Sequence, residues 1–192
     1  MTAEVAAGFS ALTAAVATVV GAVTLMLFFA RGQPWGTIND VSSVVLMLAM
    51  IPVALVTAVF LMERLTTVAL VVAAIGIAGM VAAAVLQALL VAGRVTYDGS
   101  VTAVLTAGGV VGVWYTLTGL LAGGTALQWL AGLAIASGVG FVAIMIGFRL
   151  GRERHPLSIG GGLVVLVAST AFLTLLGNGL VSGDLVVPAW NA

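Results

Sequence analysis

The residues best suited to chemistry lie in one polar segment, positions 32–40, which reads GQPWGTIND. Asp40 could act as a general acid or as an ion ligand, with Asn39 and Gln33 as hydrogen-bonding partners. Gln33 and Trp35 are also candidate ligand-binding residues. A structural interpretation competes with this one, because Asn39 or Asp40 would make a strong N-cap for a helix that follows. The residue types alone leave both interpretations open.

Other catalytic chemistry finds little support in the composition. The chain contains no lysine, no cysteine and a single histidine, so a Schiff base, a thiol relay and a multi-histidine metal site are not expected. The motifs H-E-x-x-H and G-x-S-x-G are also absent from the sequence. We therefore expect no metal site and no cofactor, and an enzymatic role is the less favoured one.

A second set of polar residues interrupts the long apolar stretches. The bulky members are Gln87, Trp114, Tyr115 and Asn178. They could line a pocket for a small molecule or a lipid, since such sites combine apolar walls with a few polar groups. Alternatively, they make hydrogen bonds between helices and serve only packing.

The composition defines the setting of these residues. Of the 192 residues 62% are hydrophobic and 6% are charged, with a mean hydropathy of +1.32. A soluble domain carries about 25% charged residues, so we expect neither a soluble protein nor a nucleic-acid partner. The pattern is typical of an all-α integral membrane protein with several spans.

Charged residues and turn formers divide the chain into six apolar stretches, each long enough to cross a bilayer. They lie at about residues 6–30, 41–62, 65–92, 101–123, 127–149 and 157–181. The sequence therefore predicts one transmembrane domain over residues 1–192, folded as a bundle of six helices.

Arginine placement predicts the orientation of this bundle. Five of the six arginines fall in connections that alternate to one side: Arg31, Arg94, Arg149, Arg152 and Arg154. Basic loops stay in the cytoplasm, so both termini are predicted outside. Trp129 and Trp190 would then lie at the outer interface and Trp35 at the inner one. The five arginines are also candidates for binding anionic lipid headgroups, at about 1 kcal/mol each.

Glycine is the other compositional feature, with 25 residues, several of them four residues apart inside the apolar stretches. Examples are Gly108 with Gly112 and Gly119 with Gly123. Small residues at this spacing let helices approach closely. They predict either packing within one bundle or association between copies of the chain.

The segment Gly32-x-Pro34-Trp35-Gly36-x-Ile38-Asn39-Asp40 resembles a loop of small six-helix bacterial membrane proteins that carry G-x-P-[FW]-G-x-[IL]-N-D between their first two helices. The likeness implies the same fold and topology. That group has no established activity, so the resemblance implies no function.

Three functions remain in play. The first is a non-enzymatic membrane subunit or oligomerising bundle in a bacterial inner membrane, alone or within a larger complex, with lipid at its cytoplasmic rim. The second is a carrier or channel for a small molecule or lipid, with a path along Gln87, Tyr115 and Asn178. The third is an intramembrane isomerase or cyclase that uses Asp40 as its acid.

Overall fold

The computed structural model describes residues 2–188, and within this range all regular secondary structure is helical, without strands. About 88% of the described residues are helical. The α-helices are α1 (Ala3–Arg31), α2 (Trp35–Val91), α3 (Tyr97–Leu121), α4 (Ala131–Gly151), α5 (Pro156–Val164) and α6 (Thr170–Ser182). Short 3-10 turns at Gln128–Leu130 and Arg152–Arg154 border α4, and a π-helical turn at Val165–Ser169 joins α5 to α6. The all-helical prediction is confirmed.

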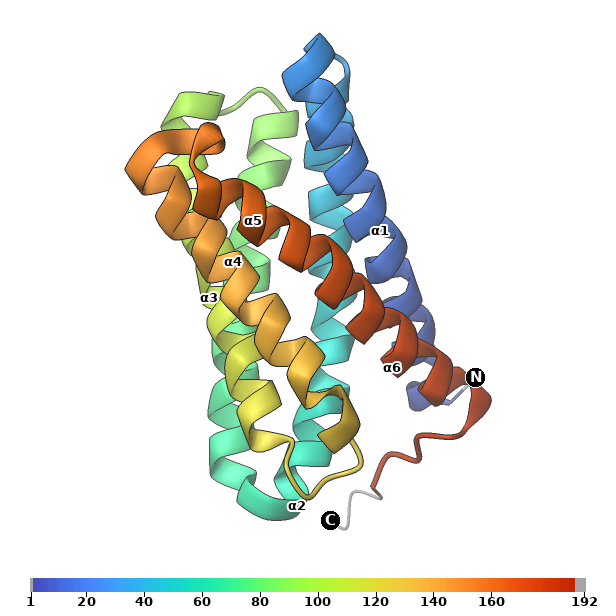
Figure 1. Cartoon of the computed structure of the whole chain (residues 1–192). Helices are drawn as coiled ribbons and strands as arrows, with labels where there is room; N and C mark the ends of the chain where they lie inside the picture. Colours follow the sequence, from blue (N-terminus) through green and yellow to red (C-terminus); the bar gives the residue numbers. More distant parts are fainter. Residues whose placement is uncertain (1, 189–192) are drawn as a thin grey trace.

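Helix α2 consists of two arms. Its 57 residues would extend roughly 85 Å if straight, at 1.5 Å per residue. Leu65 interrupts it with φ −143° and ψ 71°, values outside the helical region. The chain turns back there, and the second arm runs beside the first (Figure 1). The bend follows Glu63 and Arg64, the charged pair at which the sequence predicted a break.

The last apolar stretch is one continuous rod with an irregular middle. Residues Pro156–Ser182 form 27 helical residues in which α5, the π turn and α6 follow one another. Together with α1, α2, α3 and the region around α4, they make five helical segments that are apolar and long enough to cross a membrane. The structure therefore supports an integral membrane protein.

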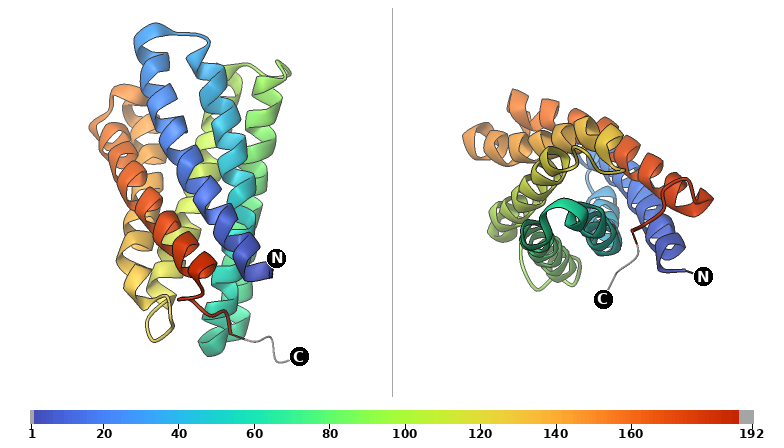
Figure 2. Two further views of the ribbon diagram at one scale, coloured as in Figure 1. Left: turned by 90° about the vertical axis from the view of Figure 1, so that its right-hand side faces the viewer. Right: turned by 90° about the horizontal axis from the view of Figure 1, so that it is seen from below.

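Each long helix has two principal neighbours. Helix α1 packs against α2 and α6, α3 packs against α2 and α4, and α4 packs against α5. The end of α1, the start of α3 and the α4–α5 connection lie at one end of the bundle (Figure 1). The bend of α2 and both described ends of the chain lie at the other (Figure 2). Trp190, predicted at the outer interface, falls outside the described residues.

Glycines make the close helix crossings. A Cβ built on Gly112 of α3 would lie 2.8 Å from the carbonyl oxygen of Gly138 in α4. Similarly, a Cβ on Gly8 of α1 would lie 3.0 Å from the carbonyl oxygen of Gly177 in α6. Gly108, four residues before Gly112, has its nearest neighbour at 3.9 Å. These contacts favour packing within one bundle as the role of the inward-facing glycines.

The Gly108 and Gly112 pair provides a matched test of this packing. In Gly112→Ala the new methyl would clash with backbone, so we expect a loss of about 1–3 kcal/mol of stability. In Gly108→Ala the methyl has room, and the gain in helix propensity makes the change neutral or slightly stabilising. Thermal unfolding of both variants in detergent measures the difference. Equal melting temperatures would contradict the assigned crossing.

Candidate functional site

Helix α2 begins within the polar segment 32–40, earlier than the sequence predicted. Helix α2 starts at Trp35, and the side chain that caps it is Gln33, whose Oε1 accepts hydrogen bonds from Thr37 N–H and Thr37 Oγ1, each at 3.2 Å. The predicted N-cap at Asn39 or Asp40 is therefore wrong. The long Gln33 side chain reaches the first turn, and Pro34 is compatible with a helix start because it has no N–H to satisfy.

Asn39 and Asp40 lie one turn inside α2 and are both half-buried. Their side chains are joined by a long contact of 3.5 Å between Asn39 Nδ2 and Asp40 Oδ1. Asn39 faces α1, because its Oδ1 lies 3.8 Å from the position of a Cβ on Gly21. Within residues 2–188 Asp40 has no cationic partner and belongs to no group that could hold a metal. A lone half-buried carboxylate of this kind offers an acid but no second catalytic group.

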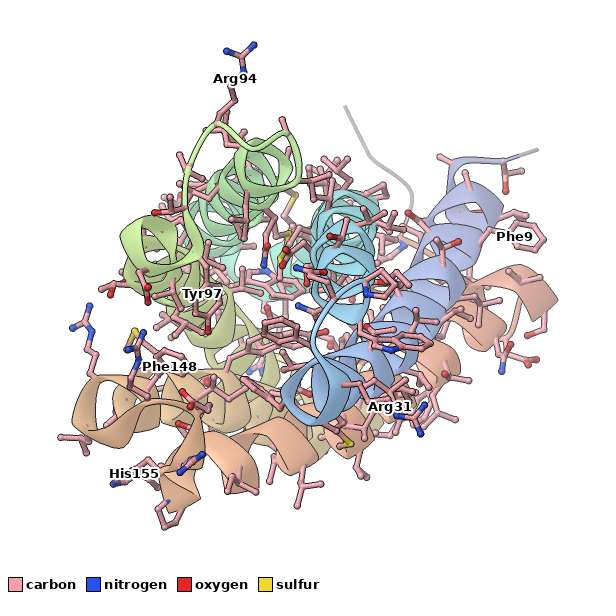
Figure 3. All side chains as sticks on the ribbon, turned by 90° about the horizontal axis from the view of Figure 1, so that it is seen from above. Phe9, Arg31, Arg94, Tyr97, Phe148 and His155 are labelled. Atoms are coloured by element: carbon pink, nitrogen blue, oxygen red, sulfur yellow. The ribbon has the colours of Figure 1, made fainter. Side chains whose placement is uncertain are left out.

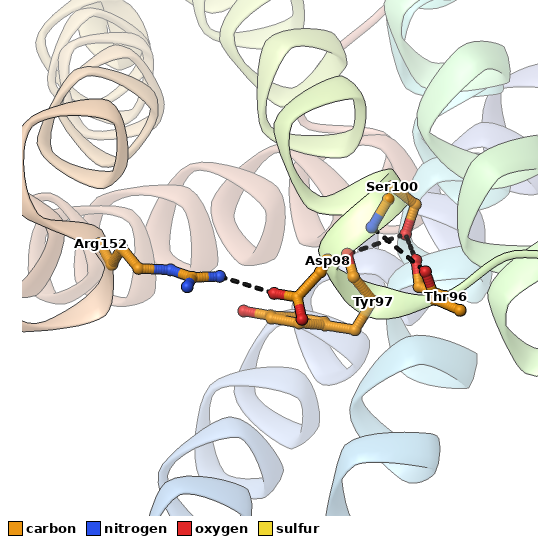
Figure 4. A network of polar contacts seen from close by, with 6 residues as sticks. Thr96, Tyr97, Asp98, Ser100 and Arg152 are labelled. Carbon is orange, nitrogen blue, oxygen red and sulfur yellow. Dashed lines mark hydrogen bonds and ion pairs between the residues drawn. The ribbon is translucent and has the colours of Figure 1, made fainter.

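The arginine-rich end of the bundle contains one ion pair. Arg152 Nη2 lies 2.8 Å from Asp98 Oδ1, and this pair connects the α4–α5 turn to the start of α3 (Figure 4). The nearby Asp98 carboxylate raises the pKa of Arg152. Both side chains are well exposed, at 61% and 81%, so the pair contributes little to stability. Arg149 is also engaged, donating to Thr106 Oγ1 at 3.0 Å.

The other three arginines of this end are exposed, and their side chains have no hydrogen-bond partner within the described chain: Arg31, Arg94 and Arg154. Arg31 and Arg94 point outward on different sides when the bundle is viewed from this end (Figure 3). The five predicted lipid-binding arginines thus lie at one end of the bundle, three of them at the end of α4 and in the turn that follows it. We call these five arginines the basic rim.

The centre of the bundle is built around Tyr115. Its side chain is fully buried, and its hydroxyl lies 2.8 Å from Ser169 Oγ and 3.4 Å from Met50 Sδ. Ring centroids of Phe172 and Phe141 lie 5.4 and 6.0 Å from that of Tyr115. One side chain of α3 therefore contacts α2, α4, the π turn and α6. The sequence singled out Tyr115 but not its partners, although Ser169 is a polar residue in the middle of an apolar stretch.

The remaining predicted ligand-binding residues are not brought together. Trp114 is buried beside Tyr115, with ring centroids 4.7 Å apart. Gln87 lies on the buried face of the second arm of α2, where its Oε1 has no hydrogen-bond partner among residues 2–188. Asn178 is exposed on α6, so it does not line a path with Gln87 and Tyr115. Trp35 is half-buried and Gln33 is occupied by its capping role.

Comparison of the chain with protein-family models, with curated proteins and with solved structures finds no match. The resemblance of residues 32–40 to the loop of small six-helix bacterial proteins therefore stays a prediction.

The contact between Tyr115 and Ser169 can be measured by a double-mutant cycle. Tyr115→Phe leaves the Ser169 hydroxyl without this partner, and hydrogen bonds between membrane helices contribute about 0.6 kcal/mol on average. We expect a coupling energy of this order between Tyr115→Phe and Ser169→Ala, measured by unfolding in detergent. Tyr97→Phe is the control, because Tyr97 is exposed and its hydroxyl makes no hydrogen bond within residues 2–188. Additive effects at positions 115 and 169 would contradict the contact.

Proposed function

We propose that the chain crosses the membrane six times, with both termini outside, in a bacterial inner membrane. The support is the two-armed α2, each arm of which has the length of one span. It is strengthened by the gathering of five arginines at one end, with only Arg64 at the other. The short connections between the helices, such as residues 92–96 between α2 and α3, are consistent with spans that alternate sides.

The absence of cysteine makes this topology directly measurable. Single-cysteine variants at exposed positions would be labelled with a membrane-impermeant maleimide in intact cells. We expect Ala126→Cys and Ser182→Cys to react from outside, and Ala92→Cys to react only after permeabilisation. Labelling of Ala92→Cys in intact cells, or opposite sides for positions 126 and 182, would overturn the proposed orientation.

We propose further that the protein is a non-enzymatic membrane subunit or oligomerising bundle that binds anionic lipid at its basic rim. The filled interior carries this proposal. Tyr115, Phe172, Leu173 and Leu176 are each at most 1% exposed, so close-packed side chains occupy the centre of the bundle. Such a packed centre favours a protein that acts through its surfaces, and the rim is the most basic part of that surface.

The carrier and the enzyme are weaker alternatives for specific reasons. A carrier or channel needs a route past Tyr115, whose hydroxyl and ring are engaged by four other side chains. An isomerase or cyclase that uses Asp40 needs a second catalytic group beside the carboxylate, whereas within residues 2–188 the Asp40 side chain is hydrogen-bonded only by Asn39. If Asp40→Asn abolished an activity on a physiological substrate, that result would support the enzyme hypothesis.

Lipid binding at the rim can be tested with two arginines in the same turn. Arg154 is unpaired, whereas Arg152 is paired with Asp98. Because each arginine near anionic lipid contributes about 1 kcal/mol, we expect Arg154→Gln to weaken phosphatidylglycerol binding about five-fold. Arg152→Gln should weaken it less. Affinity is measured as the rise in melting temperature with added lipid, using phosphatidylcholine as the comparison lipid. No preference for phosphatidylglycerol in the unmutated protein would contradict lipid binding at the rim.

A further inference from the structure

A depression lies at the end of the bundle opposite the basic rim, beside the bend of α2. It has a volume of about 190 Å³. Five apolar side chains and one arginine line it: Leu61, Arg64, Leu65, Ala69, Leu120 and Leu121. Leu120 is 64% exposed and Leu65 is 50% exposed, so the apolar wall continues onto the lipid-facing surface. The depression is smaller than a pocket that encloses a whole ligand, so it suits one part of a larger molecule.

Arg64 is held in place at this depression by backbone. Its Nη1 donates a hydrogen bond to the carbonyl oxygen of Gly123. Gly124 adopts φ +76°, and a Cβ there would lie 3.1 Å from Arg64 Nη1. The 122–125 connection thus brings its backbone against the guanidinium, where a larger residue would be both strained and crowded.

The charge of Arg64 is not neutralised by this arrangement. Within residues 2–188 no carboxylate forms an ion pair with it, although Glu63 is its neighbour in sequence. One of its five N–H groups is used by Gly123, which leaves others for a ligand. A guanidinium matches phosphate oxygens in both charge and geometry.

We propose that this depression binds a glycerophospholipid, with the phosphate at Arg64 and one acyl chain against Leu65 and Leu120. The occupant is chosen by complementarity, since a free cation beside an apolar wall that opens to the bilayer matches the charged head and the apolar tail of a lipid. This site is separate from the basic rim, because it lies at the opposite end of the molecule. The bound lipid would fill the notch between the α2 bend and α3.

The test uses the full chain in nanodiscs containing phosphatidylglycerol with a photoreactive acyl chain. After irradiation, mass spectrometry of peptides locates the adducts. We expect adducts within residues 61–69 and 120–124. Arg64→Gln should reduce them about five-fold, the effect of losing one arginine contact. Arg94→Gln, at the rim, should leave them unchanged, which separates this site from the proposed rim function.

A second variant protects the test against misfolding. Leu120→Trp fills the depression from an exposed position and retains Arg64, so it should also reduce the adducts while the melting temperature stays near that of the unmutated protein. The proposal is overturned if the unmutated protein gives no adduct in these peptides. It is equally overturned if labelling there survives Arg64→Gln and Leu120→Trp, or falls to the same extent in Arg94→Gln.

Discussion

The hydroxyl of Tyr115 must find a hydrogen-bond partner in an interior that consists largely of apolar side chains. An unpaired hydroxyl in an apolar interior costs at least about 1 kcal/mol, so its partner constrains the surrounding helices. Ser169 supplies that partner at 2.8 Å from the last position of the π-helical turn. Because a π turn adds a residue to the helix, it changes which side chains of the final rod face inward. The contact therefore links the register of the last span to that of α3.

The packing around Tyr115 follows from the same constraint. Trp114 and Tyr115 are adjacent in α3, so both can be buried only if helices cover two sides of α3. The second arm of α2 covers Trp114 closely, with Gly76 directly against the indole. On the other side Phe141 stacks on the Tyr115 ring and Phe172 meets it edge to face. Aromatic contacts and glycine crossings together fill the centre, and charged groups are confined to the two ends.

The sequence predicted those features that depend on local composition. The helical class, the break after Arg64 and the position of the arginines at one end all follow from hydropathy and charge, which act residue by residue. Contacts between distant segments were not predictable in the same way. Nothing in the local pattern identifies Ser169 as the partner of Tyr115, or says that Gly112 lies against the backbone of α4 while Gly108 has room for a methyl group. The direction of Asn178, exposed on α6, likewise depends on how the last rod rotates after the π turn.

The polar segment 32–40 illustrates a different limit of prediction from sequence, namely where a helix begins. Asn39 and Asp40 are stronger capping residues than glutamine by type, and hydropathy rises only from position 41. The helix nevertheless starts at Trp35, since Gln33 reaches the Thr37 N–H and Pro34 needs no donor partner. Capping by a long side chain from outside the helix has no sequence signature as clear as that of serine, threonine, asparagine or aspartate.

The central claim is that the protein acts through its surfaces and not through a path in its interior. A native mass spectrum of the protein, extracted gently with its lipids, tests this most directly. We expect a protein, oligomeric or joined to a partner, that retains anionic phospholipids and loses them when arginines at its ends are replaced. A lipid-free monomer that retains one small apolar molecule, released on substitution of Tyr115 and not of the arginines, would contradict it.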